Sequence, residues 1–187
     1  MSGVPARKRA TYQDLCAVPE HLVAQIIDGE LHVQPRPASP HARAASQIGG
    51  SLLGPFDAGR GGPGGWVILF EPELHLREDV LVPDLAGWRR ERMPEMPEVP
   101  FFTLAPDWIC EVLSPGTAYV DLKKKRRIYA RERVEYLWLV DPMERSLDVL
   151  RLREASWIEI GTFEGDAEVH AAPFEAVAFD LGLLWRR

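Results

Sequence analysis

The sequence predicts a mixed α/β fold in which a central mixed sheet is flanked by helices. Short apolar runs bounded by charged, proline and turn residues are typical of buried strands. Two other segments repeat apolar residues every three to four positions, which is typical of helices. The order is hairpin, helix, three strands, a fourth strand, helix and strand, and such a mixed order suits a sheet covered by helices.

The first half of the chain contains a hairpin and a helix. Asp28-Gly29 is a turn pair between apolar residues and predicts a hairpin over residues 25–33. The apolar period predicts a helix over residues 41–53, with Ser39 as its candidate N-cap. A glycine-rich loop and three strands follow, over residues 54–65, 66–70, 73–76 and 80–86.

The second half alternates strands with one basic helix. Residues 89–107 are charged and rich in proline, so we expect them to run over the surface. The elements expected after this excursion are a strand, a helix, a strand and a hairpin, over residues 108–113, 120–131, 134–142, and 147–153 with 156–163.

Length and composition indicate a soluble globular protein. The 187 residues suffice for one domain, expected over residues 11–187, after a disordered basic tail over residues 1–10. No apolar run approaches the roughly 18 residues of a membrane helix. The first residues lack the apolar stretch of a signal peptide, so we expect a cytoplasmic protein with no membrane partner. Cys16 and Cys110 lack the spacing of zinc ligands.

Two acidic residues stand alone in apolar segments. Asp84 lies in the strand predicted over residues 80–86, and Glu111 lies in the strand over residues 108–113. An isolated carboxylate in such a setting costs several kcal/mol or shifts its pKa unless a cation sits beside it. Magnesium prefers oxygen ligands and needs only one or two carboxylates. Asp84 and Glu111 are therefore the candidate ligands for Mg²⁺ or Mn²⁺ if their strands are neighbours.

The basic helix contains a candidate catalytic lysine. Lys125 lies three residues after Leu122 and four before Tyr129, so it shares their sheet-facing side, while Lys123 and Arg127 point outward. A lysine beside a metal site stabilises developing charge or orients and deprotonates a water. The alternative is an ordinary helix pair between Lys125 and Asp121, four residues earlier.

The same helix carries a run of basic residues that is a candidate contact for DNA phosphates. The formal net charge of −6 argues against a protein that coats nucleic acid by electrostatics alone, so a local basic track is needed. The alternative is a solvated helix face. The residues assigned to the track are Lys123, Lys124, Arg126 and Arg127.

These motifs, taken in order, resemble the Uma-two family, proposed restriction endonucleases of the PD-(D/E)XK superfamily. The resemblance covers about residues 11–185 and implies a restriction-endonuclease-like domain that cleaves DNA. It depends on Pro83-Asp84, on residues 111–117 (EVLSPGT), on Asp121 with Lys125 and Tyr129, on residues 135–142 (EYLWLVDP), and on residues 26–31 and 37–41 nearer the N-terminus.

The resemblance also bears on individual residues. The superfamily's third motif ends in a lysine, and here that position is Leu113. In the family the lysine has moved to the following helix, where Lys125 stands. Glu30 becomes a candidate accessory acid, against a solvated hairpin residue as the alternative. His41 follows Pro40 near a helix start, where it would contact a phosphate or a metal-bound water, or act as a cap or surface residue.

The sequence leaves other functions open. A nuclease fold without activity would serve as a DNA-binding or protein-interaction module, and the negative net charge and the missing third-motif lysine favour it. A hydrolase of small phosphate esters would have a narrow pocket instead of an open groove. Duplex cleavage often uses two sites, so a homodimer is a further possibility.

Overall fold

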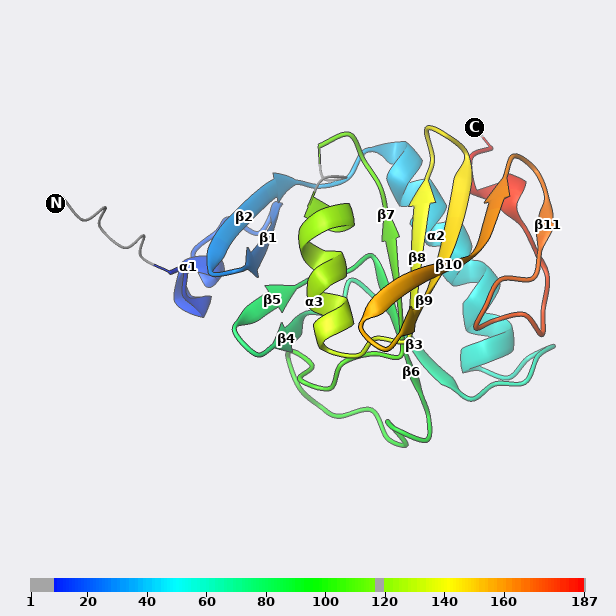
Figure 1. Cartoon of the computed structure of the whole chain (residues 1–187). Coiled ribbons are helices and arrows are strands. Elements are labelled where there is room, and N and C mark those ends of the chain that lie inside the picture. The colour runs from blue at the N-terminus through cyan, green and yellow to red at the C-terminus, as the bar shows by residue number, and fades with distance from the viewer. Residues whose placement is uncertain (1–8, 117–119, 187) are drawn as a thin grey trace, which may run out of the picture.

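The centre of the molecule is a six-stranded mixed sheet, which confirms the predicted fold class. The structure is a computed structural model that describes residues 9–116 and 120–186. The strand order is β10-β9-β8-β7-β6-β3, and β7 and β8 form its parallel pair (Figure 1). The strands are β3 (Trp66–Phe70), β6 (Leu85–Arg89), β7 (Trp108–Val112), β8 (Tyr136–Asp141), β9 (Ser146–Arg153) and β10 (Ser156–Glu164).

A four-stranded antiparallel sheet packs beside the central one in the order β2-β1-β5-β4. The predicted hairpin is confirmed: Asp28 and Gly29 have φ angles of 55° and 77°, and positive φ at both central residues suits a two-residue hairpin turn. The strands are β1 (Leu22–Ile27), β2 (Glu30–Pro35), β4 (Leu74–Leu76) and β5 (Asp79–Leu81), and a separate pair is formed by β11 (Glu168–Val169) and β12 (Phe179–Asp180).

Helices cover both faces of the central sheet (Figure 1). The long helix α2 and the C-terminal segment share one apolar cluster with one face, and α3 shares a second cluster with the other. The helical elements are α1 (Tyr12–Cys16), α2 (Ser39–Leu52) with a π-helical turn (Leu53–Asp57), a second π-helical segment (Val120–Lys125), α3 (Arg126–Arg131) and a 3₁₀ turn (Leu181–Leu184).

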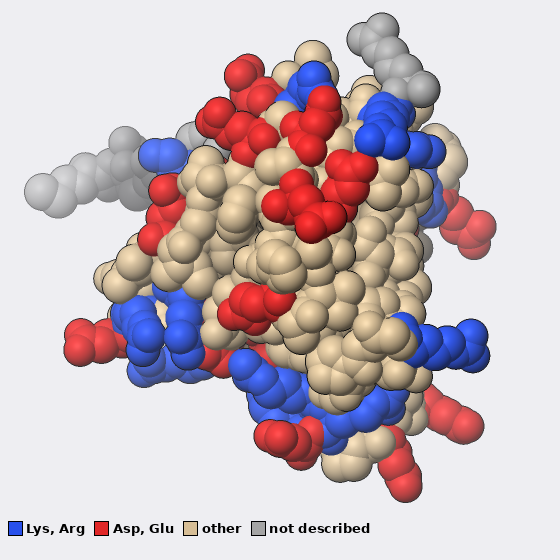
Figure 2. All heavy atoms as spheres, turned by 90° about the vertical axis from the view of Figure 1, so that its right-hand side faces the viewer, with Lys and Arg blue, Asp and Glu red and all other residues tan. Residues whose placement is uncertain are grey.

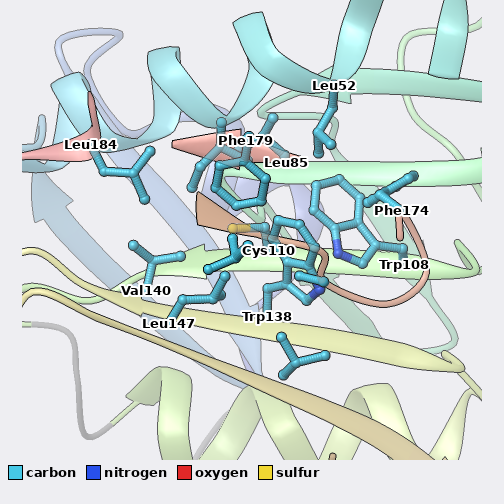
Figure 3. Packing of buried hydrophobic residues seen from close by; sticks show 14 of the residues in the cluster. Leu52, Leu85, Trp108, Cys110, Trp138, Val140, Leu147, Phe174, Phe179 and Leu184 are labelled. Carbon is cyan, nitrogen blue, oxygen red and sulfur yellow. The ribbon is translucent and has the colours of Figure 1, made fainter. Parts of the chain in front are cut away.

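Strand β7 lies in the middle of this layered core and is buried along its whole length. Cys110 and Val112 face the α2 cluster, whereas Ile109 faces the α3 cluster. On the α2 side, Trp108 and Trp138 meet edge to face with ring centroids 5.3 Å apart (Figure 3). Because side chains alternate along a strand, Glu111 projects with Ile109 into the α3 side.

The structure differs from the predictions at the strand expected over residues 80–86 and at the N-cap of α2. The strand expected over residues 80–86 is two strands, β5 and β6, which belong to different sheets and meet at a bend at Asp84. Pro83 has no N–H to donate to a continuous ladder, so the chain changes sheets there. Ser39 is not the cap of α2. Ala38 holds the N-cap position without a side-chain hydrogen bond, and Ser39 is already helical.

Within the tail expected over residues 1–10, residues 9 and 10 are described, and both contact the rest of the chain. Residues 1–8 lie outside the described residues. The Ala10 N–H donates to the Gly29 carbonyl at 2.8 Å, and Arg9 pairs with Glu78 at 2.5 Å. In the described part of the chain, no helix is both long and apolar enough to cross a membrane.

Candidate active site

Asp84 lies at the bend before β6, and Glu111 lies on the neighbouring strand β7. Strands β6 and β7 are antiparallel with Leu85 opposite Cys110. Extending this register by one residue would place Asp84, which precedes β6, opposite Glu111. Opposite residues of an antiparallel pair project to the same face. Both side chains line one cavity of about 50 Å³, which Lys125 and His41 also line. The structure therefore brings the two acids to one cavity, and their role as metal ligands stays a prediction.

The Asp84 carboxylate is held from two sides. The N–H of Val112 donates to Oδ2 at 2.6 Å, and Nε2 of His41 lies 3.1 Å from Oδ1. His41 comes from the first turn of α2, and its side chain and that of Asp84 are 11% and 15% exposed. Nδ1 of His41 is buried and has no hydrogen-bond partner among the described residues. His41 thus orients Asp84, a candidate metal ligand. The sequence did not reveal this contact between His41 and Asp84.

Glu111 is paired with Lys125 inside the protein. Nζ of Lys125 donates to both carboxylate oxygens of Glu111 at 3.0 Å, and both side chains are only 3% exposed. The Tyr129 hydroxyl donates to Oε1 of Glu111 at 2.5 Å. Lys125 also lies 3.5 Å from the carbonyl of Val82, in the segment that leads to Asp84. The ammonium group therefore sits between the two chain segments that carry the carboxylates.

The helical-face prediction is confirmed for burial. Lys125 is buried, and Lys123 and Arg127 are exposed. Lys125 ends the π-helical segment, and Tyr129 follows one turn later in α3, so both reach Glu111 from one side. The side chain of Asp121, the alternative partner, lies outside the described residues. The catalytic role of Lys125 stays a prediction.

Glu30 is not placed beside the two carboxylates. It starts β2, whereas the residues of β2 that line the cavity, Gln34 and Pro35, lie at the strand's other end. Glu30 instead accepts a hydrogen bond from Lys124 Nζ at 3.1 Å. A third acid lines the cavity beside Asp84 and Glu111: it is Glu71, whose N–H donates to the Asp84 carbonyl at 3.0 Å. Glu71 lies in a turn with φ of 44°. A turn has no helical or strand period, so no pattern in the sequence indicates where the Glu71 side chain points.

Part of the predicted basic track is engaged by the β1–β2 hairpin. Arg127 donates to both oxygens of Asp28 at 2.6 Å, and Lys124 pairs with Glu30 and lies 3.3 Å from Nε2 of His32. Burial and the charge of Lys124 lower the pKa of His32, which favours its neutral form. Two of the four positive charges are thus partly neutralised. Contact of this track with DNA stays a prediction.

The family comparison agrees with the resemblance seen in the motifs. The family model described as "Uma2: Putative restriction endonuclease" matches residues 9–182. The chain belongs to the Uma2 family. The match spans nearly all of the described residues and includes every residue that lines the 50 Å³ cavity.

A solved structure has the same fold. It is a putative nuclease belonging to DUF820 from Anabaena variabilis, 21% identical, with a TM-score of 0.75 over 94% of this chain and 97% of the other. At this identity the likeness shows the fold alone. No curated protein matches the chain.

The Uma2 site has three acidic residues, Glu71, Asp84 and Glu111, and the imidazole of His41 around the cavity. Among the described residues, no three His, Cys, Asp or Glu side chains form a ready metal-binding cluster. One or two carboxylates are nevertheless enough for magnesium, which keeps several water ligands. The oxygen donors of Asp84 and Glu111 therefore suit a hard divalent cation such as Mg²⁺ or Mn²⁺.

Proposed function

We propose that this Uma2 protein is a metal-dependent endonuclease that hydrolyses phosphodiester bonds in DNA. The observation that carries the proposal is that Asp84, Glu111 and Lys125 project into one cavity from three different elements. A buried acidic pair with a lysine is an expensive arrangement to maintain without a function. The description of the Uma2 family supports the same class of reaction.

The residues present fit a divalent ion. The cavity of about 50 Å³ exceeds the roughly 30 Å³ share of one water in the liquid, so it has room for an ion or a water. Asp84 and Glu111 would hold the ion. A bound Mg²⁺ or Mn²⁺ would supply charge stabilisation at the phosphate and lower the pKa of a water.

The chain's own groups position the reacting centre. Val112 N–H and His41 fix Asp84, which limits the carboxylate to one orientation. Lys125 places an amino group at the cavity. As an ammonium it would stabilise charge on a phosphate or orient the attacking water, and as a neutral amine it would accept a proton of that water. Its burial excludes solvent and strengthens these interactions.

A catalytically silent nuclease fold that binds DNA or a protein is the second candidate. The observation that favours it is the closed ion pair, because both oxygens of Glu111 accept hydrogen bonds from Lys125. Such a pair satisfies the two charges without a metal. A hydrolase of small phosphate esters is disfavoured, since pockets for small molecules measure about 300–1,000 Å³, whereas this cavity measures about 50 Å³.

Calorimetric titration with Mg²⁺ and Mn²⁺ separates the candidates. We expect the wild type to bind metal and Asp84→Asn to lose that binding. Asp148→Asn is the matched control, because it changes the same charge on β9 and lies outside the cavity lining. Metal-dependent cleavage of plasmid DNA by the wild type and Asp148→Asn, but not by Asp84→Asn, would establish the endonuclease. If none of the three proteins binds metal, the result would favour the catalytically silent nuclease fold.

A further inference from the structure

A second and larger cavity opens at the same edge of the central sheet as the candidate active site. Strands β7 and β8 are parallel, so their carboxyl ends meet at one edge. Ser114, beyond β7, lines the small cavity, and Pro142, beyond β8, lines a cavity of about 910 Å³. The first turn of α2 contributes to both, with His41 in the small cavity and Pro40 in the large one. In Figure 1 the ends of β7 and β8 and the start of α2 lie together at the top.

The large cavity is basic in an acidic protein. Arg43 of α2, Arg145 of the β8–β9 turn and Arg186 of the C-terminal segment line it, against one acid, Asp166. We call it the arginine cavity (Arg43, Arg145, Arg186). The whole chain has a net charge of −6. The face that Figure 2 shows carries a group of acidic side chains near its top and basic side chains in separate groups. The three arginines therefore form a local exception.

The ion pairs of these arginines are easily exchanged. Arg145 pairs with Asp166, and the two side chains are 49% and 66% exposed. Arg186 pairs with Asp180 at 2.9 Å, at 61% and 36% exposure. Exposed pairs of this kind contribute only about 0–1 kcal/mol. A phosphate can therefore replace either carboxylate at small cost.

Two of the guanidinium groups are also held in place by neutral contacts. Arg145 lies over the ring of Trp185 at 6.0 Å, and the Trp185 indole N–H donates to the Gly165 carbonyl at 3.0 Å. Nε of Arg43 donates to the Leu183 carbonyl at 3.3 Å. These contacts orient the arginines and leave their charge in place. On the basic helix, Arg127 donates to both oxygens of Asp28, in a pair that is also exposed, at 68% and 37%.

We infer that the arginine cavity binds the sugar-phosphate backbone of duplex DNA beside the bond that is cut at Asp84 and Glu111. The inference rests on the proposed function, since the two cavities share one sheet edge. Guanidinium groups suit this role because they bind phosphate oxygens through two parallel hydrogen bonds. The small cavity of about 50 Å³ cannot enclose a duplex, so a duplex needs a second contact surface, and the arginine cavity of about 910 Å³ offers one.

The test compares two charge-matched double variants of the full chain. Arg43→Gln/Arg145→Gln removes two charges from the arginine cavity. Arg60→Gln/Arg153→Gln removes two exposed charges from the opposite edge, before β3 and at the end of β9. Binding of a 30-base-pair duplex is measured by fluorescence anisotropy without divalent metal over a range of salt concentrations. Plasmid cleavage is measured in parallel with Mg²⁺.

The cavity variant should bind the duplex about tenfold more weakly than the wild type, and the slope of log affinity against log salt should fall by about 2, or about 0.9 for each lost phosphate contact. The control variant should bind within about twofold of the wild type.

Equal losses in both variants, or no duplex binding by the wild type, would overturn the inference. Cleavage by the wild type with unchanged binding by the cavity variant would overturn the inference and leave the endonuclease intact. Loss of binding confined to the cavity variant without cleavage by any protein would support the cavity and refute the endonuclease.

Discussion

Replacing Lys125 with methionine tests the centre of the site. The substitution removes the ammonium group and retains a flexible apolar stem of similar length. Glu111 is 3% exposed, so water cannot readily solvate the carboxylate that remains. Removing one partner of a buried ion pair costs about 3–5 kcal/mol. For a domain of this size each kcal/mol lowers Tm by about 2–4 °C, so we expect a fall of about 6–20 °C.

Lys123→Met is the matched control, because it makes the same chemical change two residues away on an exposed position. Its free energy of unfolding should stay within about 0.5 kcal/mol of the wild type. Urea unfolding at pH 7 without divalent metal measures both variants. If Lys125→Met unfolds within the range of the control, the buried pair with Glu111 does not form and the proposed site is wrong. Added Mn²⁺ should stabilise Lys125→Met more than the wild type, because no ammonium then competes for Glu111.

Two further predictions concern turnover and pH. If the wild type cleaves DNA, Lys125→Ala should lower turnover by about 10²-fold or more in single-turnover assays. Lys123→Ala should mainly weaken DNA binding and flatten the dependence of binding on salt, and should leave the turnover of bound DNA near that of the wild type. Burial alone would raise the pKa of Glu135, but hydrogen bonds from Arg89 and Arg151 outweigh it and lower the pKa below the ordinary 4.5. The stabilisation from a lowered carboxyl pKa is present above that value and disappears as the pH falls through the folded pKa. Glu135→Gln should therefore lower the free energy of unfolding by about 1 kcal/mol at pH 7. Urea titrations at pH 3.5 should show a smaller difference from the wild type. An equal difference at pH 7 and pH 3.5 would contradict the pairing of Glu135 with the two arginines.

The parts of the site that follow a local period could be predicted from the sequence. The spacing of Leu122, Lys125 and Tyr129 places Lys125 on the buried face, and the apolar residues around Glu111 indicate a buried strand. Helical and strand periods are local, so side-chain direction follows from neighbours a few residues away. The same reasoning finds the hairpin at Asp28 because its turn needs positive φ.

The remaining contacts join elements that are distant in the chain. The contact between His41 and Asp84 depends on how α2 docks against the bend before β6, and no local pattern encodes that docking. The contact between Glu30, the first residue of β2, and Lys124 likewise joins two distant elements, the hairpin and the π-helical segment before α3. The arginine cavity likewise gathers α2, the β8–β9 turn and the C-terminal segment.

The position of Leu113 allows a test of whether the lysine has moved between elements. Leu113 and Glu111 are two residues apart, so in the extended chain both project to the α3 side, about 7 Å apart along the strand. A lysine stem spans about 6 Å, which is enough for its ammonium to meet Glu111.

Leu113→Lys in the Lys125→Met background should therefore recover part of the lost free energy of unfolding at pH 7, together with some turnover if the wild type cleaves DNA. Leu113→Met in the same background is the uncharged control. Because Leu113 is only partly buried, a lysine there can keep its amine in water, and the double variant tolerates the new charge even where pairing is incomplete. If Leu113→Lys gives no more stability than Leu113→Met, the strand position does not reach Glu111, and Lys125 is not an equivalent of the motif lysine in another element.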